Sequence, residues 1–233
     1  MKKSDLKQIK TIAISFLYQQ IIETEYSPLI IIHPIFESAF ITIKKNNSYQ
    51  LVNLLEDDNF NIAIKEYSNL INRCETVFSV YMIIRKSYKL TFLKYIKDYL
   101  SINDFSNLLA HSWVLSENPN DDTNVSIDEL INWFCEADKL ILMDETEYKI
   151  YRSIPETIKL YRGVAVGRNP NGLSWTDNKE KAIWFSNRFN NTKKGYLLEC
   201  VFSKNDILAF FDSRDENEYV VNIKNAKQIL KIN

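Results

Sequence analysis

The sequence Leu160-Tyr161-Arg162-Gly163 marks the point at which the character of the chain changes. All four glycines of the protein come after residue 160, at Gly163, Gly167, Gly172 and Gly195. Long helices seldom need glycine, whereas tight turns and a close approach of the backbone to a ligand do. We therefore expect a mainly helical region before this point and a small sheet with turns after it.

The segment after residue 155 has the pattern of a small mixed β-sheet. Short runs rich in β-branched and aromatic residues are separated by polar turns, which is typical of strands. Residues 177–188 instead have a helical period, and Thr176 or Asp177 could cap the first turn of this helix. The predicted strands cover residues 158–166, 196–202, 207–211, 218–223 and 228–232.

The first two thirds of the chain have the apolar spacing of helices. This spacing predicts helices within residues 6–21, 62–84, 88–100, 104–114 and 144–151, and the capping-box pair Ser126 and Glu129 predicts another. Residues 38–53 could form a small hairpin with its turn at residues 45–48, or a loop between helices. The expected fold class is α+β, with a helical N-terminal region, residues 1–103, and a second domain, residues 104–233. The motifs described below lie within residues 155–223.

Composition limits the classes of function. The 233 residues have a net charge of −1, with 45% hydrophobic and 25% charged residues. This is typical of a folded soluble protein with no overall attraction to nucleic acid or to an anionic membrane. No run approaches the ~20 apolar residues of a membrane span, and the apolar residues 11–18 lack a signal cleavage site. We expect a cytoplasmic protein without membrane contact, although leaderless delivery into a host cell would leave no mark.

Cysteine and histidine are scarce. Cys74, Cys135 and Cys200 are far apart and have no metal-binding spacing, which argues against a disulfide framework, against a zinc site and for a reducing compartment. His33 and His111 are the only histidines, so we predict no metal site. His33 lies in an apolar stretch before a proline, and we interpret it as structural.

The sequence contains three short polar motifs, and the first two lie at the edges of apolar, strand-like segments. Arg162 presents a rigid fork of donors that suits phosphate oxygens, and Gly163 beside it would let a ligand reach the backbone. Ser174 and Thr176 share one face of a strand because alternate residues do, so Trp175 should point into the core. A surface ion pair and a helix cap are the simpler explanations of each motif taken alone.

The third motif is a pair of carboxylates. Glu216 and Glu218 are two residues apart and share a face at the start of a predicted strand. Like charges this close should raise the pKa of one carboxyl group, which suits a pair that divides charge stabilisation from activation of an acceptor. A solvated acidic turn is the alternative.

Taken together, the motifs resemble those of the arginine–serine–glutamate class of mono-ADP-ribosyltransferases. The order Tyr161-Arg162-Gly163, Ser174-x-Thr176 and Glu216-x-Glu218 matches that class, and the residues that follow Thr176 are like those of many bacterial and phage members. The resemblance covers residues 155–223. It departs from the family at Trp175, where a small residue is usual, and in the short span from Arg162 to the C-terminus.

The resemblance implies that NAD is the co-substrate and assigns a role to each residue. Arg162 would hold the pyrophosphate, and the backbone of Gly163 would contact the nicotinamide amide. Ser174 would bind the nicotinamide ribose and orient Glu218, and Thr176 would support that carboxylate. Glu218 would bind the ribose 2′-hydroxyl and stabilise the positive charge that develops as nicotinamide leaves.

The resemblance also implies a macromolecular acceptor, in the first instance an arginine side chain of a protein. Glu216 would position or deprotonate the acceptor, and the segment containing Phe210, Phe211 and Arg214 would face it. Nucleic acid is an alternative acceptor because a basic cluster lies nearby. The cluster consists of Lys179, Lys181, Arg188, Lys193 and Lys194.

Two further alternatives stay open. The chain could be an NAD glycohydrolase, with water as the acceptor, or a non-catalytic binding module built on the same fold. The extra length of residues 1–103 suggests docking of an antitoxin, a host protein, another regulator or a second copy of the chain.

Overall fold

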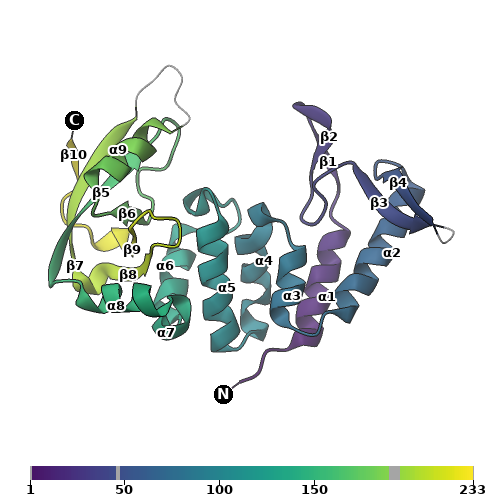
Figure 1. Cartoon of the computed structure of the whole chain (residues 1–233), viewed down its shortest axis with the longest axis horizontal. Coiled ribbons are helices and arrows are strands. Elements are labelled where there is room, and N and C mark those ends of the chain that lie inside the picture. The colour runs from purple at the N-terminus through teal and green to yellow at the C-terminus, as the bar shows by residue number, and fades with distance from the viewer. Residues whose placement is uncertain (1, 46–47, 189–194, 233) are drawn as a thin grey trace. The chain divides into compact units, whose positions relative to one another are not determined.

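The computed structural model describes residues 2–45, 48–188 and 195–232, and these fall into two compact units, Met1–Leu108 and Leu109–Asn233. Helices and antiparallel strands occupy separate stretches of the chain (Figure 1), which confirms the predicted α+β class. The division between the units falls inside helix α5 (Ile102–Leu115). From the sequence, that whole helix was expected in the second domain.

The first unit combines helices with two hairpins. The hairpin expected at residues 38–53 is present, and its strands pair from Phe40 with Asn53 to Lys45 with Ser48. Residues 46 and 47 of its expected turn lie outside the described residues. A second hairpin, β1–β2, was not expected. The elements are α1 (Leu6–Leu17), β1 (Ile22–Thr24), β2 (Ser27–Ile32), β3 (Phe40–Lys45), β4 (Ser48–Asn53), α2 (Asp57–Arg73), α3 (Val77–Ile83), η1 (Lys86–Tyr88), α4 (Lys89–Ile96) and η2 (Lys97–Tyr99).

The single helix expected over residues 62–84 is in fact two helices. Helix α2 ends at Arg73, and a new helix begins after Thr76, whose side chain accepts from the Ser79 amide while the Ser79 hydroxyl accepts from the Thr76 amide. This reciprocal cap satisfies two amides that would otherwise lack partners at a helix start. Apolar spacing continues across the break, which is why periodicity alone did not show it.

His33 is a buried structural residue of the first unit, as expected from the sequence. Its side chain has no exposed surface, and its Nδ1 accepts from the amides of Ile35 and Phe36, both at 3.1 Å. The ring also stacks on Phe36, with 4.7 Å between centroids. Burial disfavours the charged ring and lowers the pKa of His33 from 6.5 to about 4, although backbone carbonyls nearby oppose the shift.

The depressed pKa of His33 predicts acid sensitivity of the fold. Because the folded pKa lies below the unfolded one, the neutral ring contributes stability that is fully present above pH 6.5 and is lost as the pH falls toward 4. We expect unfolding in urea to require about 2 kcal/mol less at about pH 5 than at about pH 7.5. His33→Asn keeps an acceptor for both amides and cannot titrate. If this variant showed the same loss between the two pH values, His33 would not be its cause.

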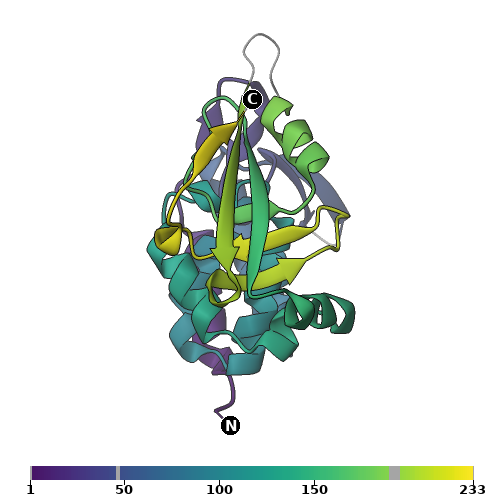
Figure 2. The same cartoon turned by 90° about the vertical axis from the view of Figure 1, so that its left-hand side faces the viewer.

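The second unit consists of helices and a six-stranded sheet with the order β10-β7-β5-β6-β9-β8. Figure 2 shows β5 and β7 as a long upright pair, while β8 and β9 lie across their direction. Besides α5, the elements are η3 (Pro119–Asp121), α6 (Ile127–Glu136), α7 (Lys139–Leu142), α8 (Glu145–Ser153), β5 (Thr157–Val164), β6 (Ser174–Thr176), α9 (Lys179–Asn187), β7 (Tyr196–Ser203), η4 (Lys204–Asp206), β8 (Ile207–Phe211), β9 (Glu218–Val221), η5 (Ile223–Asn225) and β10 (Leu230–Ile232).

The expectation of a mixed sheet was wrong, because neighbouring strands of the described sheet all pair antiparallel. The chain passes from β6 through α9 to β7, and this crossover returns it in the same direction. Both strands are antiparallel to β5, so they are parallel to each other, but β5 lies between them. β6 and β7 are therefore parallel in direction without being neighbours in the sheet.

Trp175 points into the core of this unit, as alternation along the strand predicted. Its side chain is buried, and its ring lies edge-on to Phe202 with 5.1 Å between centroids. The indole nitrogen donates to the carbonyl oxygen of Gly172 at 3.1 Å. Within the described part of the chain, no helix is long and apolar enough to cross a bilayer.

Candidate active site

The three motifs lie together because their strands are neighbours in the sheet. Strand β6 lies between β5 and β9, and Thr176 pairs with Tyr161 on one side and with Glu218 on the other. The motifs line one cleft, which has about 890 Å³ of empty space when its open mouth is included. Its lining residues include Glu117, Asn120, Tyr161, Arg162, Gly163, Arg168, Ser174, Thr176, Phe185, Arg188, Arg214, Glu216 and Glu218.

Glu218 is a buried carboxylate with two donors on the same oxygen. The hydroxyl of Ser174 donates to Oε1, and the indole Nε1 of Trp113 donates to that oxygen at 3.0 Å. The side chain lines the cleft although only 7% of its surface is exposed. A carboxylate so enclosed is stable only with donors of this kind.

Burial raises the pKa of Glu218 above its ordinary value. The bonds from Ser174 and Trp113 and the positive charge of Arg214 oppose this shift, while the negative charge of Glu216 adds to it. A raised pKa was expected from the carboxylate pair. The direction agrees, but the main cause is desolvation rather than the second carboxylate.

Trp113 is a site residue that the sequence did not reveal. It lies on α5, 105 residues before Glu218 in the chain. Its position at helical spacing among apolar residues is typical of a core residue, and only 1% of its surface is in fact exposed. No local signal distinguishes a core tryptophan whose N–H points to a carboxylate from one whose N–H points to a carbonyl.

Thr176 braces the segment that carries Glu216. Its hydroxyl donates to the carbonyl oxygen of Glu216 at 3.1 Å and accepts from the amide of Asn178 at 3.2 Å. The expectation that Thr176 or Asp177 caps helix α9 was wrong, because the side chain of Asn178 accepts from the amides of the first turn. The bond therefore holds the backbone of Glu216, and the expected support of the Glu218 carboxylate by Thr176 stays a prediction.

Arg162 lines the cleft and is bonded to backbone carbonyls on two sides. Its guanidinium donates to the oxygen of Ser174 at 2.7 Å and to that of Asn169 at 2.9 Å. These bonds tie the loop after β5 to the strand that carries Ser174. A guanidinium has five N–H donors, so such bracing is compatible with the expected contact to phosphate, which stays a prediction.

Gly163 of β5 lies against the backbone of helix α9. A Cβ at this position would lie 2.6 Å from the backbone nitrogen of Ser186 and still closer to the carbonyl oxygen of Ala182. The lack of a side chain is therefore required for the helix to pack on β5. The expected contact between the Gly163 backbone and nicotinamide stays a prediction.

The expectation that Phe210 and Phe211 face an acceptor was wrong. Both lie in β8, with 1% and 3% of their surface exposed, and they pack against Tyr219 and Phe134 respectively. All five residues of β8 are buried because both faces of this strand are covered. Arg214 does line the cleft, and it forms an ion pair with Glu216 at 2.8 Å.

The segment between β8 and β9 holds Glu216 between two residues in the left-handed region. Asp215 has φ of 54° and Asn217 has φ of 46°. Asparagine and aspartate tolerate this region better than most residues, and backbone held there is usually constrained by its surroundings. Here the amide of Asn217 donates to Asp212 at 2.9 Å. The result is a fixed position for the Glu216 backbone.

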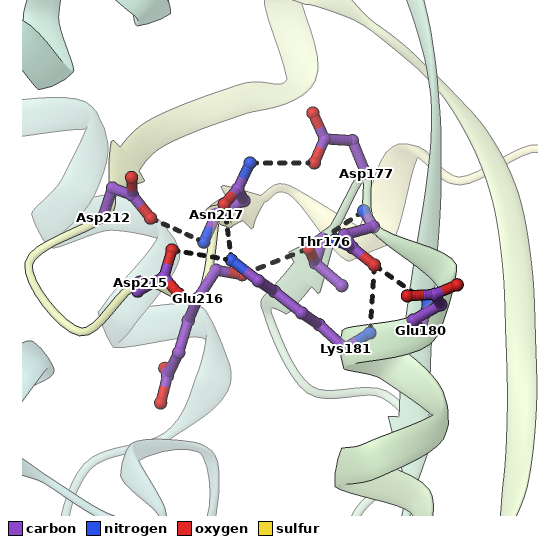
Figure 3. Close-up of polar contacts among 9 residues, drawn as sticks. Thr176, Asp177, Glu180, Lys181, Asp212, Asp215, Glu216 and Asn217 are labelled. Carbon is purple, nitrogen blue, oxygen red and sulfur yellow. Dashed lines mark hydrogen bonds and ion pairs between the residues drawn. The ribbon is translucent and has the colours of Figure 1, made fainter.

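Lys181 of α9 holds the same segment from the other side. Its Nζ donates to Asn217 Oδ1 at 2.8 Å and to Asp215 Oδ1 at 3.1 Å, so one ammonium group bonds both left-handed residues (Figure 3). The Asp215 carboxylate is 95% exposed, so this ion pair is weak. The bond to Asn217 is part-buried and carries most of the effect.

Removal of the Lys181 ammonium group should loosen the segment that carries Glu216. We expect Lys181→Met to lower the free energy of unfolding by about 1 kcal/mol, since one part-buried charged hydrogen bond and one exposed ion pair are lost. Urea unfolding measures this change. Lys179→Met, on an exposed residue of the same helix, is the matched control. Equal losses in the two variants would contradict the bracing role.

The charge of the cleft suits an anionic ligand that also carries polar groups. Four arginines (Arg162, Arg168, Arg188, Arg214) and three glutamates (Glu117, Glu216, Glu218) line it. Three aromatic residues, Tyr161, Trp175 and Phe185, are also part of its lining. Among the described residues, no group of three or more histidines, cysteines, aspartates or glutamates could hold a metal ion.

Comparisons of the chain with models of protein families, with curated proteins and with solved structures give no significant match.

Proposed function

We propose that the second unit is an NAD-dependent mono-ADP-ribosyltransferase that breaks the nicotinamide–ribose bond and transfers ADP-ribose to a macromolecule. The observation that carries the proposal is the bond from the Ser174 hydroxyl to the buried Glu218 carboxylate, in a cleft that Arg162 also lines. A binding module would not need a carboxyl group that is buried in a cleft and bonded to two donors, since burial of such a group is costly.

Glu218 would stabilise the sugar cation. As nicotinamide leaves with the bonding electrons, positive charge develops on the ribose ring, and a carboxylate in a water-poor cleft is worth more there than in bulk water. The analogous use of a carboxylate against an oxocarbenium-like transition state is known from glycoside hydrolysis. The same carboxylate would accept a hydrogen bond from the ribose 2′-hydroxyl.

The arginines would hold the phosphates of NAD. Arg162 lies beside Ser174, so its guanidinium would be close to the reacting ribose, while Arg168 and Arg188 add positive charge to the lining of the cleft. Guanidinium groups bind phosphate oxygens through paired N–H donors. Aromatic rings of the lining offer surfaces for a base to stack on.

Glu216 would serve the acceptor. An arginine side chain of a target protein would bond to this carboxylate, its nitrogen would form the new bond to the ribose C1 atom, and its proton would pass to Glu216. In the structure Arg214 already forms an ion pair with Glu216 at 2.8 Å. An incoming arginine must therefore displace Arg214.

That ion pair favours one second candidate, an NAD glycohydrolase. With Glu216 engaged by Arg214, water can reach the sugar cation without competing for the carboxylate. The nucleic-acid alternative is weaker because Lys181, one member of the basic cluster, is bonded to Asp215 and Asn217. Lys193 and Lys194 lie outside the described residues.

The test uses the full chain and NAD labelled in its adenylate part, incubated with a lysate that contains protein and RNA. Nicotinamide release shows cleavage, and the position of the label names the acceptor: protein for the first proposal, RNA for its variant, free ADP-ribose for the glycohydrolase. No release of nicotinamide, together with no NAD binding by calorimetry, would leave only a non-catalytic module.

The first unit supports a separate proposal, docking of an antitoxin or another regulator in the cytoplasm. Its two hairpins expose large side chains, with Tyr26 at 93%, Tyr49 at 78% and Leu51 at 70% of their surface. Tyr49 and Leu51 are alternate residues of β4 and share one face of it, and neighbouring exposed apolar groups can form an interaction surface. If Tyr26→Ser and Tyr49→Ser together left every co-purifying partner bound to the full chain, these hairpins would not be the docking site.

A further inference from the structure

We infer that Trp113 is a positioning residue of this active site: with Ser174 it fixes Oε1 of Glu218, so that Oε2 is the oxygen that meets the ligand. The catalytic role of Trp113 rests on the proposed function, whereas its hydrogen bond to Glu218 does not. Trp113 lies outside the three sequence motifs, and its indole reaches the site through the bond to Glu218.

The indole is held in place by its surroundings. Trp113 has 1% of its surface exposed, and its ring lies edge-on to Phe134 at 5.0 Å between centroids. Phe134 is itself fully buried. Because a ring packed in this way has no space to rotate, the direction of its N–H is fixed by the core. The donor is thus preorganised before any ligand binds.

Both donors bond to the same oxygen of Glu218. The bonds from Trp113 Nε1 and Ser174 Oγ end on Oε1, and within the described residues no protein donor bonds to Oε2. A carboxylate has about four acceptor positions. Oε2 is not among the buried atoms that lack a partner in the described residues, so it keeps accessible surface, and a ligand in the cleft can supply a donor to it. A ribose hydroxyl is a donor of the right kind, and Glu218 lines the cleft that would hold it.

The two donors differ in what they do to the charge. A serine hydroxyl can donate or accept, so Ser174 can adapt to either protonation state of the carboxyl group. An indole N–H can only donate, so Trp113 always favours the anion. The other charged groups near Glu218 are Arg214, which favours the anion, and Glu216, which opposes it. The guanidinium of Arg162 is bonded to the backbone carbonyl of Ser174 rather than to Glu218.

The experiment replaces Trp113 with β-(3-benzothienyl)alanine, which keeps the shape of indole and has sulfur in place of N–H. Carboxyl NMR with glutamate labelled at Cδ follows the titration, and Glu218→Gln identifies the resonance. We expect the pKa of Glu218 to rise by about one unit. The acid limb of nicotinamide release should move by the same amount, so that release falls up to about tenfold below both pKa values.

Trp133 supplies the matched control, since it is also a buried tryptophan of this unit and is not part of the cleft lining. The same analogue at Trp133 should leave the Glu218 titration unchanged, whatever it does to stability. An unchanged Glu218 pKa with the analogue at Trp113 would overturn the inference. Absence of nicotinamide release by the unmodified chain would instead overturn the proposed function, and with it the catalytic meaning of the Trp113 bond.

Discussion

Replacement of Glu218 by glutamine should lower nicotinamide release from NAD about 100- to 1,000-fold, the range seen when one electrostatic contact to a transition state is removed. The amide oxygen of glutamine can still accept from Ser174 and Trp113, so the side chain should keep its position. What it loses is the negative charge that faces the ribose ring. The loss should therefore appear in kcat rather than in NAD binding.

The same substitution should not destabilise the protein. Burial raises the pKa of Glu218 above its value in the unfolded chain, so ionisation costs more in the folded state, and stability is lost as the pH rises from the unfolded to the folded pKa. A neutral amide removes this cost of a buried charge. The melting temperature of Glu218→Gln at neutral pH should thus be equal to or higher than that of the unchanged chain. An active-site loss with gained stability excludes unfolding as its cause.

Single-turnover release of nicotinamide, measured with NAD in excess of its dissociation constant, checks this prediction. The matched control is Glu180→Gln, an exposed carboxylate on α9 that does not line the cleft. This variant should retain full release. Equal turnover by Glu218→Gln and the unchanged chain would remove Glu218 from the mechanism, and the proposed function would lose the observation that carries it.

The resemblance to the transferase family implied that Ser174 meets Glu218, whereas strand geometry alone predicted only which residues share a face. Alternate residues share a face, so Ser174 and Thr176 were expected on one side and Trp175 on the other. The buried Trp175 agrees with this. The register could not be derived, because pairing of Thr176 with Glu218 depends on contacts along the whole of β6 and β9.

The helix cap shows where local signals become ambiguous. Thr176, Asp177 and Asn178 are all residue types that cap helices, and they are consecutive. The structure uses all three differently: Thr176 bonds Glu216, Asp177 accepts from the hydroxyl of Tyr219 at 3.0 Å, and Asn178 caps α9. Tertiary partners decide among equal candidates, and those partners come from β9 and the segment before it, far along the chain.

The sequence also did not show which strands and helices are buried on all sides. Phe210 and Phe211 point to opposite faces of β8, so one of them should be exposed on a sheet with a single covered face. Both are buried because helices and the rest of the sheet cover the two faces. The bond from Trp113 to Glu218 could not be predicted for a related reason. The spacing of apolar residues indicates which face of a helix is buried, but not which partner a buried polar atom bonds to.

Gly163→Ala should be the most destabilising of these single changes in the second unit. The added methyl group would overlap the Ala182 carbonyl oxygen and lie 2.6 Å from the Ser186 nitrogen, and both are backbone atoms of α9. Overpacking against flexible side chains costs roughly 1–3 kcal/mol, and a helix backbone has less freedom to move. We expect a loss near the upper end, about 3 kcal/mol, with a fall in melting temperature of roughly 10 °C.

The control separates this overlap from a general intolerance of glycine replacement. Gly167 has φ of +77°, and a Cβ added there would have no other atom within 4 Å. Asparagine tolerates the left-handed region, so Gly167→Asn should cost less than about 1 kcal/mol. Ala182→Gly should not rescue Gly163→Ala, because the overlapping atom belongs to the backbone. If the melting temperature of Gly163→Ala equalled that of the unchanged chain, α9 would be shown to shift away from β5. Helix α9 also carries Lys181, which holds the segment of Glu216. If α9 shifted in this way, the proposed transfer of ADP-ribose should become slower.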